Sequence, residues 1–298
     1  MRVHDWPIRI ISITLLCGCA GRTELMDYVP DGDDFHEQAS GIPGFTTSAG
    51  TNAGGFGGMG SGGEPGKGGG EAGAAGTPVS TGIYVNGRTR LYEIDVDASN
   101  IISSTHLDGC PDEMLDIAIQ RTGELIGVTS NSVFGIDSSS GHCILKNQGF
   151  DYPNSLAFVP AIPSGDEILV GYRDGTYCRI DPATGIVHKL GSLDPGYTSS
   201  GDLAVVDGHV YASVKGPGCN DCLVEIDRDT GTIRQFIGAM SMGNVFGLAQ
   251  HHGMLYGFSQ QGLLARIDRT SASIQTQPIV NALPDLNFWG AASLPDVS

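Results

Sequence analysis

The sequence predicts an all-β protein assembled from repeated four-stranded units. The first observation is a turn that recurs along the C-terminal part of the chain, where an Ile-Asp pair opens a short polar loop. The second is that short segments with alternating apolar and polar residues flank each turn, as strands with one buried face do. The third is the even spacing of the five aspartates, which lie 41 to 46 residues apart: Asp95, Asp137, Asp181, Asp227 and Asp268. Such spacing indicates one repeated supersecondary unit.

Residues 1–18 have the features of a signal peptide. Arg2 and Arg9 precede the apolar run IISITLLCGCA. This run has the length of a signal-peptide core and is too short to cross a bilayer as a mature helix. It therefore predicts export of the chain.

The end of this run resembles the bacterial lipobox, in which a leucine and one or two small residues precede a cysteine that receives a lipid. The matching residues are Leu16, Cys17, Gly18 and Cys19, although cysteine is unusual at the middle position. The resemblance implies a lipoprotein with a diacylglycerol on Cys19, which would be its membrane anchor. An ordinary secreted protein with another cleavage site is the alternative. Because Ala20 is not the aspartate associated with inner-membrane retention, we expect an outer-membrane or cell-surface location.

Residues 19–79 are predicted to be a disordered, glycine-rich tether. Between Gly41 and Thr77 there are 16 glycines in 37 residues, with few apolar side chains to form a core. The formal net charge of −17 repels phosphate backbones, so nucleic acid is not an expected partner. Residues 80–298 remain as the folded domain, which we expect to be monomeric.

Four strands can be assigned to each unit of residues 80–298. In the unit around Asp181 they are NSLAFV, EILVGYRD, GTYCRI and GIVHKL. Four short strands per unit are typical of a β-propeller blade. The first unit lacks its innermost strand and residues 287–293 have no unit after them, so the C-terminal strand is predicted to close a ring of five blades. A longer solenoid, or a sixth blade formed from the tether, are the alternatives.

The recurring aspartates are predicted to accept hydrogen bonds from the backbone of their own turns. A glycine four residues later supplies the positive φ that such a turn needs. The last turn, DRTSAS, lacks this glycine, and we expect it to be looser. Calcium ligation by these aspartates is the less favoured interpretation.

The repeats, especially DIAIQRTGELIGVT and LARID, resemble the broad superfamily of bacterial β-propellers that includes quinoprotein-like, NHL-like and lactonase-like proteins. The resemblance covers most of residues 82–293. It implies the fold and no particular activity.

Five cysteines follow the signal segment. Cys110 precedes the innermost strand of the second blade and Cys143 lies in its outer strand, and we predict a disulfide between them. Cys219 and Cys222 are expected to form a local disulfide in a long loop of the fourth blade. A redox or zinc site is the alternative there, but no helix N-terminus or further ligand is apparent. Cys178 is expected to be a buried free thiol.

The mouth of the central channel is the expected place of ligand binding. The loops that precede the inner strands contribute candidate ligand-binding side chains, which are Tyr152, Asn154, Tyr197, Asn244 and Trp289. Aromatic rings and amides suit a protein or a glycan. For Phe246 and Trp289, packing between blades is the alternative.

Asp116 and Asp202 occupy equivalent positions on two inner strands. Two carboxylates beside one channel are secondary candidates for Ca²⁺ ligands, and the lactonase-like resemblance implies a metal-dependent hydrolase or lyase as the alternative function. Hydrogen bonding to a neighbouring blade is favoured, because the other inner strands carry Ser or Gly there. No catalytic set can be assembled, and no cofactor is expected. The sequence thus favours a non-enzymatic binding or scaffold module of the cell envelope, while leaving catalysis open.

Overall fold

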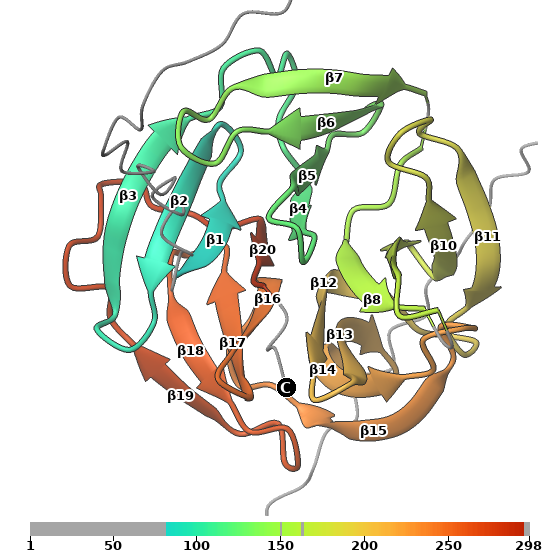
Figure 1. The fold of residues 1–298 in the computed structure, drawn as a ribbon. Coiled ribbons are helices and arrows are strands. Elements are labelled where there is room, and N and C mark those ends of the chain that lie inside the picture. Colours follow the sequence, from blue (N-terminus) through green and yellow to red (C-terminus); the bar gives the residue numbers. More distant parts are fainter. Residues whose placement is uncertain (1–81, 150, 162–163, 295–298) are drawn as a thin grey trace, which may run out of the picture. The chain divides into compact units, whose positions relative to one another are not determined.

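Five antiparallel sheets of four strands each surround a central axis (Figure 1). The computed structural model describes residues 82–149, 151–161 and 164–294. The predicted signal peptide, the lipidation site at Cys19 and the tether at 19–79 lie outside these residues. The five sheets confirm the predicted five-bladed β-propeller.

The first blade is built from both ends of the described chain. Its strands are β20 (Gly290–Ala292) innermost, then β1 (Ile83–Asn86), β2 (Arg90–Asp95) and β3 (Asn100–His106). β1 pairs antiparallel with β20, so that Tyr84 lies opposite Ala292 and Asn86 opposite Gly290. The predicted closure by the C-terminal strand is therefore confirmed.

Each of the other four blades runs from its innermost to its outermost strand in chain order. The second blade comprises β4 (Asp116–Ile119), β5 (Leu125–Val128), β6 (Ser132–Ile136) and β7 (Cys143–Gln148), and the third β8 (Ala157–Pro160), β9 (Glu167–Arg173), β10 (Thr176–Ile180) and β11 (Val187–Ser192). The fourth comprises β12 (Thr198–Val206), β13 (His209–Gly216), β14 (Cys219–Ile226) and β15 (Ile233–Ala239), and the fifth β16 (Val245–His251), β17 (Met254–Ser259), β18 (Leu264–Ile267) and β19 (Ile274–Gln277). Within the described part of the chain, no helix is long and apolar enough to cross a membrane.

The hydrophobic core is divided into five clusters, one at each interface between neighbouring blades. Between the first and fifth blades, the fully buried ring of Phe288 meets the rings of Tyr92 and Phe258 edge-on, at centroid distances of 5.9 and 5.5 Å. Edge-to-face packing is a favoured aromatic geometry. Because the core lies between blades, ring closure buries the faces of the first and fifth blades that pack against each other.

The five aspartate turns share one hydrogen-bond pattern. Asp181 Oδ1 accepts the N–H groups of Ala183 and Thr184, at 2.9 and 3.2 Å, and the other four aspartates bind the equivalent donors. The prediction that the last turn is looser is wrong, because Asp268 accepts the same two N–H groups as the other aspartates. Ala272 takes the glycine's place with φ 57° and donates its N–H to the Asp268 carbonyl at 2.9 Å, and in the first turn Ser99 likewise replaces the glycine, with φ 52°. Ala272 is buried between the fourth and fifth blades, and this packing holds a backbone conformation that costs an L-residue about 1 kcal/mol or more.

Both predicted disulfides are present, and Cys178 is buried and free. The Cys110–Cys143 bridge joins the connection before β4 to the outer strand β7 of the same blade. Cys219 and Cys222, however, do not lie in a long loop. They are the first and fourth residues of β14, because β13 and β14 continue as one extended hairpin whose turn is Pro217 and Gly218.

We expect Cys110→Ser to lower the free energy of unfolding by about 3.5 kcal/mol, because its bridge closes a 33-residue separation and removes more unfolded-state entropy than a short one. The matched change is Cys219→Ser, whose bridge spans a separation of 3 and contributes about 2 kcal/mol. Urea unfolding without reductant measures both. Equal losses would contradict the entropic account.

Candidate functional site

Two buried carboxylates at the centre of the ring collect one backbone N–H from every inner strand. Each donor lies in an innermost strand or, for Leu156, directly before β8, on the side where no further strand accepts its hydrogen bond. The donors are the N–H groups of Ile117, Leu156, Leu203, Leu248 and Ala291. Asp116 accepts the first two at 2.8 and 2.5 Å, and Asp202 accepts the other three at 2.6, 2.9 and 3.2 Å. We call this arrangement the aspartate hub.

The hub needs a proton, because its two carboxyl groups are fully buried and hydrogen-bonded to each other. Burial raises the pKa of Asp116 well above its ordinary value, and the neighbouring charge of Asp202 raises it further. Burial also raises the pKa of Asp202, while three N–H bonds oppose the shift. Since Asp202 has three N–H donors and Asp116 two, we assign the proton to Asp116, which donates it to Asp202.

Small residues at the equivalent positions of the other inner strands leave room for the two carboxyl groups. A Cβ on Gly290 would overlap Asp116 Oδ1 and come within 2.7 Å of Asn86 Oδ1. This Asn86 oxygen is buried and accepts no hydrogen bond from the described residues.

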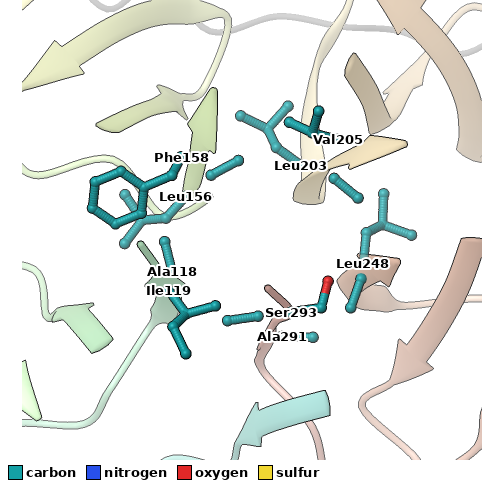
Figure 2. Close-up of a pocket in the computed structure, with 13 residues that line it drawn as sticks. Ala118, Ile119, Leu156, Phe158, Leu203, Val205, Leu248, Ala291 and Ser293 are labelled. Atoms are coloured by element: carbon teal, nitrogen blue, oxygen red, sulfur yellow. The ribbon is translucent and has the colours of Figure 1, made fainter. Parts of the chain in front are cut away.

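Beyond the hub, the inner strands line a narrow apolar channel (Figure 2). Its wall includes one alanine from each inner strand: Ala118, Ala157, Ala204, Ala249 and Ala292. Figure 2 shows Ile119, Phe158 and Val205 around the opening, with Ser293 as the polar side chain among the residues drawn. The cavity is about 30 Å³, which is room for water and not for an organic ligand.

The hub does not fit a Ca²⁺ site. A calcium ion needs six to eight oxygen ligands with free lone pairs. Here every carboxylate oxygen of Asp116 and Asp202 already accepts a backbone N–H, and the positive ends of these five dipoles would face the ion. The hydrogen-bonding interpretation of Asp116 and Asp202 agrees with these contacts, since both bind N–H groups of other blades.

At the end of the ring where the inner strands begin, Trp289 lies in a group that we call the Trp289 cluster, with Phe246, Arg88 and Glu113. The guanidinium carbon of Arg88 is 4.3 Å from the Trp289 ring centroid, and the Phe246 ring is 5.8 Å away. Arg88 also pairs with Glu113 at 2.9 Å. Both rings are partly exposed, and the Trp289 backbone is held by its N–H bond to the Asn86 carbonyl at 2.8 Å. Sequence reasoning missed Arg88, which carries no signal beyond its place in a hairpin turn.

The other four predicted binding residues do not join this cluster. Asn154 and Asn244 are exposed, and Asn244 bonds to Gln260 across its own blade at 3.4 Å. Tyr197 packs toward the rim, with its ring 6.4 Å from that of Phe236 on the outer strand β15. Tyr152 is 4 % exposed and donates its hydroxyl to the Gly185 carbonyl at 3.1 Å. Placing Tyr152 at the channel mouth is therefore wrong, because this hydrogen bond and the surrounding apolar side chains hold it between the second and third blades.

Comparison with known proteins identifies no family for this chain. No protein-family model matches the chain, and no curated protein matches it. Similar solved structures include a Bacteroides caccae protein of unknown function, at 13 % identity and a TM-score of 0.43, with 70 % of this chain and 97 % of that one covered. A gluconolactonase from Xanthomonas campestris has 12 % identity and a TM-score of 0.43, with 65 % of this chain and 70 % of that one covered. Virginiamycin B lyase from Staphylococcus aureus has 18 % identity and a TM-score of 0.38, with 70 % of this chain and 73 % of that one covered. At these identities we draw no activity from them.

We expect Asp202→Ala to lower the free energy of unfolding by more than about 3 kcal/mol, because it leaves three buried N–H groups without acceptors. Asp116→Ala removes two acceptors and should cost about 2 to 5 kcal/mol. Asp112→Ala, in the exposed loop before β4, is the matched control and should change little. Denaturant unfolding would contradict the hub if all three variants behaved alike.

The hub also predicts a pH dependence. A carboxyl whose pKa is raised on folding binds its proton more tightly in the folded state, so the free energy of unfolding falls as pH rises from about 4 toward neutrality. Asp116→Asn keeps the shape, one acceptor oxygen and, through its amide N–H, a donor to Asp202, but it does not titrate, so it should flatten this slope. Unfolding curves at several pH values measure it, with Asp112→Asn as control. An unchanged slope in Asp116→Asn would overturn the assignment of the proton to Asp116.

Proposed function

We propose that this protein is a non-enzymatic binding module of the cell envelope, which recognises a protein partner through the Trp289 cluster. The single observation that carries the proposal is this group of a tryptophan, a phenylalanine and an arginine, partly exposed at the mouth of a rigid ring. Tryptophan and arginine are enriched among the residues that dominate protein interfaces.

The geometry of the cluster favours a protein over a glycan. Arg88 already covers one face of the Trp289 ring, so a sugar would have to compete for that face or use the edge. A protein partner can instead contact the exposed parts of both rings and the Arg88–Glu113 pair together. This pair is about half exposed on each side, so it contributes little to stability and remains available to a partner.

The centre of the ring supports binding rather than catalysis. The two buried carboxyl groups use their oxygens to bind backbone N–H groups, and the cavity beyond them has an apolar wall. A general acid or base must reach the substrate, and the hub faces only its own strands. The alternative of a metal-dependent hydrolase or lyase at this place is not favoured by any contact.

The proposed location rests on the sequence. Leu16, Cys17, Gly18 and Cys19 resemble a lipobox, and the glycine-rich residues 19–79 give the propeller reach from a membrane. The module would be attached through a lipid on Cys19 and present its loop face to a neighbouring envelope protein.

A photo-crosslinking residue in place of Phe246 should yield a discrete protein adduct in intact cells. Adding Trp289→Ala should reduce the adduct at least about tenfold, since an aromatic anchor contributes roughly 2 kcal/mol or more. The same crosslinker in place of Phe236, which is 48 % exposed on the outer strand β15, is the matched control. Equal adducts from both positions, or none from position 246, would contradict a protein partner at the mouth.

Cys19→Ala should prevent lipid attachment and release the protein from the membrane fraction, because the sulfur of Cys19 is the proposed lipid carrier. Cys17→Ala keeps a small residue at the middle lipobox position and should leave attachment intact. Metabolic labelling with a radioactive fatty acid, followed by fractionation, distinguishes the two. Loss of label in Cys17→Ala with retention in Cys19→Ala would show that Cys17 carries the lipid, which would contradict the proposal for Cys19.

A further inference from the structure

Two consecutive histidines meet an aspartate at the end of the ring opposite the Trp289 cluster. His251 is the last residue of β16, and His252 begins the turn to β17. Asp97 lies in the aspartate turn between β2 and β3 of the first blade. The chain separates this aspartate from the histidines by most of the propeller, and ring closure brings them together.

The ligand atoms of these three side chains are close enough to share one ion. One nitrogen from each imidazole and one Asp97 oxygen all lie within 4.8 Å of one another. His251 Nε2 is 3.5 Å from Asp97 Oδ2, and the two imidazole centroids are 4.1 Å apart. Ligand atoms around a tetrahedral Zn²⁺, with bonds of about 2.0 to 2.2 Å, lie about 3.3 to 3.6 Å apart, so the distance from His251 to Asp97 already fits and the other separations are within about 1.5 Å of this value. Rotation of the three side chains would bring their ligand atoms to the separation that a shared zinc ion requires.

We propose that Asp97, His251 and His252 form a Zn²⁺ site, with three protein ligands and a fourth position open to water. Two imidazoles and one carboxylate are a ligand set that zinc accepts. We call these residues the His-His-Asp site. It lies at the opposite end of the ring from the Trp289 cluster and uses none of the residues of the aspartate hub.

The backbone presents all three ligands in fixed positions. Asp97 donates its N–H to Asp95 Oδ1 at 3.0 Å, which fixes the turn that carries it. His252 and Gly253 both have positive φ, 49° and 71°, so they form the tight hairpin turn that asparagine and glycine usually occupy. Histidine is, with asparagine and aspartate, one of the non-glycine residues enriched at positive φ, so the turn conformation itself permits it. Its imidazole lies against that of His251, where a shared ion would explain it.

The surroundings of the His-His-Asp site suit a cation. His251 is mostly buried, with 16 % of its side chain exposed, and its ring packs edge-on against Tyr256 at 6.5 Å. The carboxylate of Asp207 lies near the turn at Gly253 and is paired with Arg269 at 2.9 Å. Arg266 is directed to Met254, where its Nη2 is 3.0 Å from the sulfur. Of these two arginines, Arg269 thus has a carboxylate partner, and the net charge of −17 attracts cations to the molecule.

An ordinary ion pair between histidine and carboxylate looks different in this same molecule. His209 Nδ1 lies 2.9 Å from Glu225 Oε1, in direct hydrogen-bond contact and without a second histidine. In the His-His-Asp site the corresponding contact is longer, at 3.5 Å, and a second imidazole adjoins it. A bound ion would also join the first and fifth blades, which meet where the two ends of the propeller close.

The test is zinc titration of the full chain, purified with its disulfides closed and dialysed against a chelator. We expect one Zn²⁺ per chain at micromolar or better dissociation constant, and Co²⁺ in its place should give the intense visible absorption of a tetrahedral complex. His251→Ala, His252→Ala and Asp97→Asn should each weaken zinc binding more than about tenfold, since even residues that only support ligands have effects of that size. Zinc should raise the unfolding temperature of the unmodified chain and not of these variants.

His209→Ala is the matched control, since it removes a surface histidine with a carboxylate partner and should leave zinc affinity unchanged. Circular dichroism checks that each variant is folded, and Asp97→Asn is the mildest, because asparagine preserves the shape of the side chain. Zinc affinity that is the same in the unmodified chain and the His251→Ala, His252→Ala double variant would overturn the proposal. A loss in His209→Ala equal to that in the site variants would also overturn it.

Discussion

The central constraint on this molecule is that five buried backbone N–H groups at the axis of the ring need hydrogen-bond acceptors. Arranging five open sheets around an axis leaves each outermost strand with a short outer edge and turns the inner edges toward one another. An N–H group there is buried and has no strand opposite it, and leaving it without an acceptor costs about 1 to 3 kcal/mol. Asp116 and Asp202 accept all five of these N–H groups between them.

The aspartate hub restricts which residues can stand next to it. Two carboxyl groups fit side by side only with a shared proton and with no side chain at Gly290, where a Cβ would overlap Asp116 Oδ1. Because each aspartate binds N–H groups of other blades, the hub also links strands that no interface cluster joins directly. The hydrophobic clusters bind each blade to its two neighbours, whereas Asp202 reaches strands of the fourth, fifth and first blades. Buried polar groups of this kind stabilise one arrangement only when every member has a partner.

With its centre used for structure, the propeller offers function at its two ends. One end carries the Trp289 cluster, in which rings and charges from different blades stand partly exposed on a rigid frame. The other carries the His-His-Asp site, at the interface where the first and last blades meet. These two ends are separated by the packed blades, so a partner at one and an ion at the other would not compete. The tether proposed for residues 19–79 would leave both ends free to be approached.

The sequence by itself determined the number of blades and the closing strand, because these follow from local patterns repeated at a fixed spacing. Both disulfides are predicted from the places of the cysteines within single blades. Five Ile-Asp turns and five aligned alanines specify strands and turns residue by residue. The tertiary structure alone decided what each side chain near the axis does. The sequence favours hydrogen bonding of Asp116 to a neighbouring blade, but nothing near it in the chain indicates that the donor is the N–H of Leu156 or that it shares a proton with Asp202. Likewise, Tyr152 and Trp289 both look like mouth residues, yet one is buried by its neighbours and the other remains partly exposed. Local periodicity fixes which segments become strands, whereas contacts across blades depend on how a closed ring places residues that lie far apart in the chain.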